Sequence, residues 1–140
     1  MANAVYNRFK REIANGGIDL DTDTIKVMLV TSTYTPSIDT HVVLSDITNE
    51  VTGTGYTAGG ATLANKTMTQ DNTNDRGVFD ADDTTWDTST ITARAAVIYK
   101  DTGSAATSTL ICYKDFGSDK TSTAGPFTIQ WDATGILRFE

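Results

Sequence analysis

Alternation of apolar and polar residues predicts short β-strands along most of the chain. In the clearest case, Ile91, Ala93, Ala95, Val97 and Tyr99 are expected to share one face of a strand. A two-residue period is typical of a strand with one buried side. Weaker forms of the pattern predict further strands over residues 24–30, 61–69, 78–79, 109–116, 127–131 and 136–139.

Turn residues between these strands predict two hairpins. A connection rich in Gly, Ser and Ala over residues 101–107 would join the strand ending at Tyr99 to the strand 109–116, and the turn 132–135 would join the last two strands. Residues 117–125 are expected to form a polar loop. The period-two positions predict a core that consists of Ile25, Val27, Leu29, Ala95, Val97, Phe127, Ile129 and Trp131.

One amphipathic helix is predicted at the start of the chain, over residues 3–15. Val5, Phe9 and Ile13 follow one another at intervals of four residues, and Gly16-Gly17 stands where a helix terminator is expected. The helix would either cap an open end of the β core or act as an arm that docks on another subunit. Residues 41–47 are ambiguous between a short helix and an irregular segment.

The order of these elements predicts an all-β fold in a single domain, residues 1–140. Parallel sheets need repeated crossover helices, whereas here one helix precedes many short strands. The expected architecture is an antiparallel β-sandwich with one N-terminal helix, and the pattern leaves jelly-roll and immunoglobulin-like strand orders both open. The 26 Thr among the 140 residues agree with this class, because Thr is favoured on half-exposed strands.

Charge and composition indicate which classes of partner and which cellular compartment are expected. The net charge is −7. Residues 1–18 carry a charge of +2 through Arg8, Lys10, Arg11 and Glu12, so the rest of the chain is strongly acidic. Because nucleic-acid backbones are bound by basic surfaces, we expect no binding to nucleic acid. No apolar run approaches the roughly 18 residues that a membrane span needs. The single Cys112 lies in an apolar strand pattern and predicts a buried thiol, and the start of the chain does not resemble a secretory signal. The single cysteine and the start of the chain agree with folding in a reducing cytoplasm.

Two acidic segments are candidate metal-binding loops, but neither has the residue spacing that such a loop requires. Asp19, Asp21 and Asp23 have the spacing that opens an EF-hand loop, but Thr24 and Val30 stand where that loop requires Gly and Glu. The acidic segment 80–83 fails the same test. The sequence therefore predicts no metal site, and both segments are interpreted as solvated turns.

Candidate catalytic motifs fail as well. The glycine-rich segment 53–60 has Ala58 where a dinucleotide-binding loop needs Gly, and a strand instead of a helix follows it. The single histidine, His41, is expected to face solvent and has no recognisable nucleophile partner. We therefore expect no enzyme activity and no cofactor.

Seven segments of the chain resemble a recurrent family of small virion structural proteins of tailed bacteriophages. They are residues 3–10, 18–30, 34–39, 53–66, 80–86, 91–103 and 127–137, and together they span nearly the whole chain. The resemblance implies a capsid decoration or cement protein that binds and stabilises the head shell on the capsid surface and is made in the host cytoplasm. The implied partners are the major capsid protein and further copies of the chain in a homo-oligomer. A tail or head-fibre module that binds host glycans, and a head-tail connector or tail component, are the alternatives.

The N-terminal helix is the predicted contact with such partners. Its basic residues oppose the acidic remainder of the chain, and its apolar stripe is larger than an exposed helix would carry. The predicted interface consists of Val5, Tyr6, Arg8 and Phe9.

Overall fold

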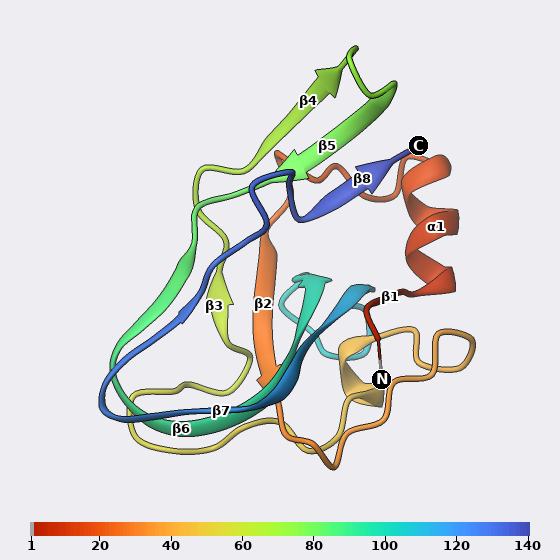
Figure 1. Ribbon diagram of the computed structural model, residues 1–140. Coiled ribbons are helices and arrows are strands. Elements are labelled where there is room, and N and C mark those ends of the chain that lie inside the picture. Colours follow the sequence, from red (N-terminus) through yellow and green to blue (C-terminus); the bar gives the residue numbers. More distant parts are fainter. Residues whose placement is uncertain (1) are drawn as a thin grey trace.

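Two antiparallel sheets and one short helix make up the computed structural model, which describes residues 2–140 (Figure 1). The five-stranded sheet has the order β1 (Ala4–Val5), β7 (Leu110–Ile129), β6 (Thr84–Lys100), β2 (Ile25–Val30) and β3 (Ala61–Thr62). The three-stranded sheet has the order β4 (Thr67–Asp71), β5 (Arg76–Asp80) and β8 (Leu137–Phe139). Helix α1 spans Asn7–Ala14, and the 3-10 helix η1 spans Leu44–Asp46. The predicted all-β, sandwich-like architecture is confirmed, and the described residues form no barrel.

The long β6–β7 hairpin is the main element of the fold, and Figure 1 shows that it curls strongly along its length. The first predicted hairpin is thereby confirmed. The prediction of a polar loop over 117–125 is wrong, because β7 continues through it. Ala93 pairs with Lys120 and Ala95 pairs with Asp115, so β7 advances five residues where β6 advances two. Such an insertion bends a strand and increases its twist, and it explains the curl.

At the same place along β6, its side chains change from one buried cluster to another. Ile91 and Ala93 belong to one buried cluster, whereas Ala95, Val97 and Tyr99 belong to another. The single shared face predicted for these five residues is therefore wrong. The change from one cluster to the other coincides with the register change between Ala93 and Ala95.

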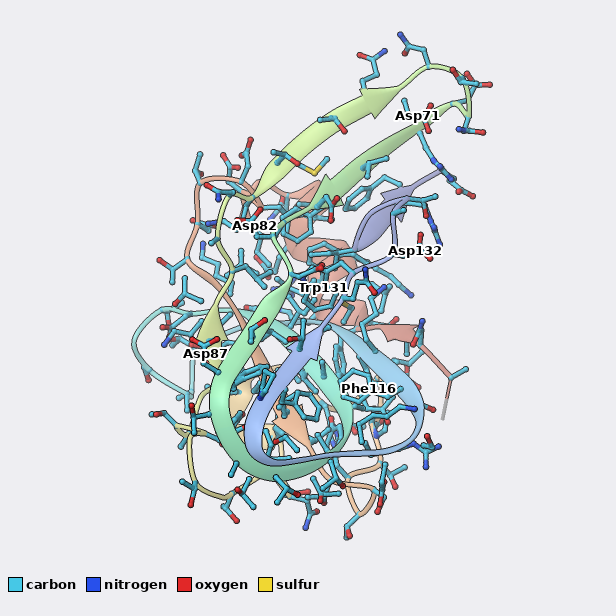
Figure 2. All side chains as sticks on the ribbon, turned by 60° about the vertical axis from the view of Figure 1, so that its left-hand side comes forward. Asp71, Asp82, Asp87, Phe116, Trp131 and Asp132 are labelled. Carbon is cyan, nitrogen blue, oxygen red and sulfur yellow. The ribbon has the colours of Figure 1, made fainter. Side chains whose placement is uncertain are left out.

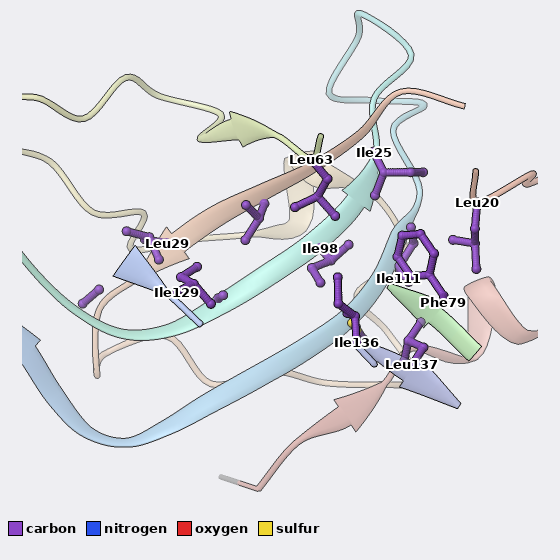
Figure 3. Close-up of a cluster of buried hydrophobic side chains, with 14 of the residues drawn as sticks. Leu20, Ile25, Leu29, Leu63, Phe79, Ile98, Ile111, Ile129, Ile136 and Leu137 are labelled. Carbon is purple, nitrogen blue, oxygen red and sulfur yellow. The ribbon is translucent and has the colours of Figure 1, made fainter. Parts of the chain in front are cut away.

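The larger cluster lies between the two sheets, which both contribute to it (Figure 3). Ile25, Leu29 and Ile98 come from the five-stranded sheet, and Phe79 and Leu137 come from the three-stranded sheet. The smaller cluster contains Tyr6, Met28, Val30, Tyr34, Ala95, Val97, Tyr99, Leu110 and Tyr113, and residues 44 and 47 pack against it. Seven of the eight predicted core residues are buried, and Trp131 is half-buried against the larger cluster.

Two predicted strand assignments are wrong because the chain crosses between the sheets. The strand expected over 61–69 is split into β3, which pairs with β2, and β4, which pairs with β5. The second predicted hairpin does not form. Phe127 pairs with Trp86 in one sheet, whereas Phe139 pairs with Gly77 in the other. The turn at 132–135 thus links two sheets.

The N-terminal segment also differs from its prediction. The helix expected over 3–15 begins only at Asn7, and Ala4 and Val5 form β1, which pairs with Tyr113 and Cys112 of β7. Tyr6 has an extended backbone with φ −70° and ψ 140°, and its side chain is buried. Ala4 and Val5 instead obtain backbone partners from β7, and the Tyr6 backbone N–H donates to the Ile111 carbonyl at 3.1 Å.

Candidate binding groove

A groove lies on the inner side of the bent β7, between that strand and the segment that leads to β8. Its volume is about 550 Å³. Figure 2 shows Phe116, Trp131 and Asp132 on this side of the molecule. We call it the β7 groove, and its lining includes the apolar residues Phe116, Pro126, Phe127, Ile129, Trp131 and Ile136 and the charged residues Lys114, Asp115, Lys120, Asp132 and Arg138.

The floor of the β7 groove is aromatic and held by the core. The ring centroids of Phe116 and Phe127 are 6.2 Å apart, and Phe127 lies 6.2 Å from Trp86 in an edge-to-face arrangement. Rings at such separations attract one another beyond simple burial. Trp131 is fixed by two hydrogen bonds, since its indole Nε1 donates to the Asp82 carbonyl at 3.0 Å and its backbone N–H donates to the Asp83 carboxylate at 2.9 Å.

The rim of the β7 groove carries charges of both signs. Arg94 donates from Nε to the Asp115 carboxylate at 2.9 Å, and this bond is the main reason why the pKa of Asp115 falls to about 2. Lys114 donates from Nζ to the Ile136 carbonyl at 2.5 Å and ties the strand to the C-terminal segment. Lys120 and Arg138 are exposed. Three cationic and two anionic side chains thus line one opening.

Asp132 is held in the turn that closes the β7 groove. Its carboxylate accepts hydrogen bonds from the Thr134 backbone N–H at 2.8 Å and from the Thr134 hydroxyl at 2.5 Å. These bonds lower the pKa of Asp132, with the hydroxyl as the larger cause. The carboxylate is therefore a fixed negative charge at neutral pH. An apolar floor with a charged rim is the usual arrangement of a protein–protein contact surface.

The predicted interface residues lie elsewhere, in and around α1, and two of them are used inside the domain. Tyr6 is completely buried and its hydroxyl lies 2.9 Å from that of Tyr34, while Phe9 is 2% exposed. Val5 is half-buried in β1. Arg8 is half-buried and pairs with Glu12 at 2.8 Å. The apolar stripe that suggested an assembly arm thus covers the domain's own core, while Val5 and Arg8 keep part of their surface.

His41 does not face solvent as predicted. Its ring is half-buried and stacks on Tyr34 with centroids 5.6 Å apart, and its Nδ1 lies 2.9 Å from the Tyr34 hydroxyl. The Ser37 backbone N–H donates to the same nitrogen at 3.3 Å, so Nδ1 acts as an acceptor there. This bond sets the tautomer of the ring, with its proton on Nε2.

Cys112 is a buried thiol, as its strand pattern predicted. Its exposed fraction is 0%, and burial raises its pKa to about 12. The thiolate, which is the reactive form, is therefore strongly disfavoured at neutral pH.

The acidic and glycine-rich segments have structural partners. Asp23 accepts a hydrogen bond from the Asp19 backbone N–H at 2.8 Å and pairs with Lys100 at 2.9 Å. In the glycine-rich segment, the Tyr56 hydroxyl donates to Glu50 at 2.9 Å. Within residues 2–140, no group of three or more His, Cys, Asp or Glu side chains is placed to hold a metal ion, and no helix is long and apolar enough to cross a membrane.

Sequence reasoning missed the β7 groove because its walls come from separate places. Phe116 and Lys120 were assigned to a strand end and a loop, Trp131 to the core and Arg138 to the last strand of a hairpin that does not form. They meet only because β7 bends and the C-terminal segment returns along it. The local pattern carries no signal of that bend.

Comparisons with protein-family models, with curated proteins and with solved structures give no match to the chain. Its function is therefore inferred from its own residues and geometry.

Proposed function

We propose that the protein is a virion structural component of a tailed bacteriophage, a capsid decoration protein that binds and stabilises the head shell. The structural observation that supports a binding role is the β7 groove, which offers a partner an aromatic floor and a rim of both charges on a strand scaffold. The resemblance of seven sequence segments to small virion proteins supports the same function and names the partner, the major capsid protein.

The construction of the β7 groove suits a docked protein segment. Phe127, Ile129 and Ile136 are buried by the core, and Trp131 is fixed by hydrogen bonds, so little side-chain freedom is lost when a partner binds. Loss of such freedom costs about 0.5–1.5 kcal/mol for each flexible side chain that an interface orders. Because the side chains of the groove floor are already ordered, binding costs less side-chain entropy and the contacts give a higher affinity.

The charged rim supplies specificity. Lys120 and Arg138 are exposed cations, and Asp132 is an exposed anion in the same opening. A partner must place opposite charges at these points, because like charges across an interface oppose binding. We expect the shell segment in the β7 groove to carry an acidic residue near Lys120 and an apolar residue against Phe116.

Repetition on a shell would turn a modest contact into stable decoration. A symmetric shell presents many identical sites, and linked binding events gain avidity without new contacts. The net charge of −7 favours solubility of the free protein before assembly.

Co-sedimentation with undecorated heads of the parent phage tests the proposal. The full chain is expected to pellet with the heads and to saturate at a fixed ratio to the shell protein. Lys120→Glu and Phe116→Ala should each weaken this binding about tenfold or more, the effect of losing one central contact of an interface. Lys120 is exposed, so Lys120→Glu should change the melting temperature little. Phe116 packs against the larger cluster, so binding of Phe116→Ala is measured at a temperature at which circular dichroism shows the variant to be folded.

Lys10→Glu is the matched comparison, because it reverses the same charge on the exposed side of α1. It should bind heads like the unmodified protein. Loss of binding with Lys10→Glu but not with Lys120→Glu would place the contact on the helix and overturn the role of the β7 groove. A full chain that binds tails or glycans but not heads would overturn capsid decoration.

A further inference from the structure

Strand β4 presents a free edge of five residues. It forms one side of the three-stranded sheet and pairs only with β5, and Figure 1 shows the β4–β5 hairpin projecting from the body of the molecule. The strand at the other side of this sheet, β8, has only three residues. In the larger sheet β1 covers only Cys112 and Tyr113 of β7, so the outer side of β7 beyond them is a longer free edge, but one interrupted by register shifts. A free edge presents unpaired backbone groups that another strand can use.

The edge of β4 has a single charged residue, Asp71, to oppose pairing. Natural edges are commonly guarded by Lys, Pro or a bulge, but residues 67–71 read Thr-Met-Thr-Gln-Asp and pair with β5 without a register shift. Residues 67–70 are exposed. Among the large apolar side chains of the described residues, Met68 alone is exposed, at 40%.

Met68 lies on the face of the small sheet that continues into the core. Its register partner in β5 is Phe79, which in turn pairs with Leu137 of β8, and both of these residues are buried. The terminal methyl group of Met68 also reaches along β5, to 3.7 Å from the point where a Cβ atom would stand at Gly77. Met68 is thus the outermost member of an apolar row that a strand added to β4 would cover.

The sequence of β4 is complementary to itself in antiparallel pairing. With Thr69 opposite Thr69 of a second copy, Met68 lies opposite Gln70 and diagonal to the second Met68, and Thr67 lies opposite Asp71. Thr–Thr pairs and apolar diagonals are favourable across strands, and no like charges face each other. The arrangement has a two-fold axis, which is the commonest symmetry of homo-oligomers.

Charge supports the same orientation. Lys66 directly precedes β4 and Asp71 ends it, where it also pairs with Arg76 of its own copy at 3.1 Å. Antiparallel pairing brings the Lys66 end of one copy beside the Asp71 end of the other, whereas parallel pairing would bring equal charges together. We propose that two copies of this chain join through their β4 edges, about a two-fold axis at Thr69, to form one continuous six-stranded antiparallel sheet.

The dimer does not depend on capsid binding and is tested in free solution. A five-residue edge is small beside the roughly 20–30 residues that each partner of a standard interface contributes, so the dimer should be weak and concentration-dependent. Sedimentation velocity of the full chain should show a monomer–dimer equilibrium. Thr69→Lys places two positive charges on the axis and should weaken association about tenfold or more.

Thr88→Lys is the matched control, because Thr88 is an exposed Thr of β6 away from the β4 edge. It should associate like the unmodified chain. A protein that stays monomeric at all accessible concentrations, or a dimer that Thr69→Lys leaves unchanged, would overturn the proposal.

Disulfide trapping tests the register. Directly opposed residues of an antiparallel pair have Cβ atoms about 4.5–5.5 Å apart, close to the range that a disulfide bridges. Thr69→Cys should therefore give a covalent dimer on oxidation, whereas Thr67→Cys should not, because its opposite residue is Asp71. The native Cys112 is buried and should not contribute. Equal crosslinking of both variants, or of neither, would reject the axis at Thr69.

Discussion

A single carboxylate fastens the bend of β7 to its surroundings. Asp115 accepts hydrogen bonds from Arg94 Nε and from the Gly117 backbone N–H, both at 2.9 Å, and its own backbone N–H donates to the Asn3 side chain at 2.8 Å. Gly117 has φ +82°, a conformation that favours glycine. Residues of β6, β7 and the N-terminal segment therefore meet at one residue, Asp115, beside the β7 groove.

Replacement of Asp115 by Asn should lower stability at neutral pH and flatten its dependence on acid. The folded pKa of about 2 lies below the unfolded value of about 3.9, so the folded state binds fewer protons. The stabilisation is fully present above pH 4 to 5 and is lost as pH falls towards 2. With screening by solvent, we expect Asp115→Asn to reduce the free energy of unfolding by about 1 kcal/mol at pH 7.

Denaturant unfolding at pH 7 and at pH 2 to 3 measures this effect of Asp115→Asn. The difference between the unmodified chain and the variant should shrink at the lower pH. A difference that stays constant across this range would show that the ion pair with Arg94 does not stabilise the fold.

The buried Ile129 supports a second prediction for a single residue. It is 6% exposed, belongs to the cluster between the sheets and is the last residue of β7 to pair with β6. Ile129→Ala should lower the free energy of unfolding by about 2–5 kcal/mol, because it removes apolar contacts and leaves a cavity. Thr128→Ala, at the exposed neighbouring position, should cost much less. Equal effects of the two substitutions in denaturant unfolding would contradict the burial of Ile129.

At the scale of the elements, the apolar side of α1 packs against the core of its own domain. Phe9 is its buried residue and lies 6.3 Å from Phe139 of β8 between ring centroids, while β1 adds two residues to the edge of the large sheet. The N-terminal segment thus touches both sheets. It acts as a cap on the core, which is one of the two roles that its pattern predicted.

Deletion of residues 1–15 should therefore destabilise the isolated domain. It removes the fully buried Tyr6, the buried Phe9 and the pairing of β1 with β7. Loss of one buried aromatic side chain costs about 3–5 kcal/mol, so a large fall in melting temperature is expected from thermal unfolding followed by circular dichroism. A truncated chain that melts like the full chain, but no longer associates, would instead identify the segment as an assembly arm.

At the scale of the whole molecule, the two sheets share one core. The cluster between them contains residues of β2, β6 and β7 together with Phe79 of β5 and Leu137 of β8. The chain crosses between the sheets three times, at 63–66, 81–83 and 130–136. Neither sheet can bury its apolar face without the other.

We therefore predict one cooperative unfolding transition, as expected of a single domain of this size. Fluorescence of Trp86 and Trp131 and far-ultraviolet circular dichroism should give the same midpoint in denaturant. The calorimetric and van't Hoff enthalpies should agree. Two separated transitions would show that the sheets unfold independently and would contradict a single domain over residues 1–140.

The local sequence determined the type and place of many elements. The alternation at 91–99, the apolar residues at 25–30 and the buried position of Cys112 all follow from side chains that are neighbours in the chain. The two-residue period depends on the backbone of one strand, so the strand class, the central β2 and seven of the eight predicted core residues are confirmed. The proposed function stays a prediction, and it rests in part on the same sequence.

Only the tertiary structure decided which strands pair and where they bend. Phe127 and Phe139 have equally regular local patterns, yet one pairs with β6 and the other with β5. The residues inserted near Asp115 bend β7, and the β7 groove lies at this bend. Pairing energies come from contacts between residues far apart in sequence, and a period of two is the same for every possible partner. The sequence pattern therefore determined that these segments are strands, and long-range packing alone selected their neighbours.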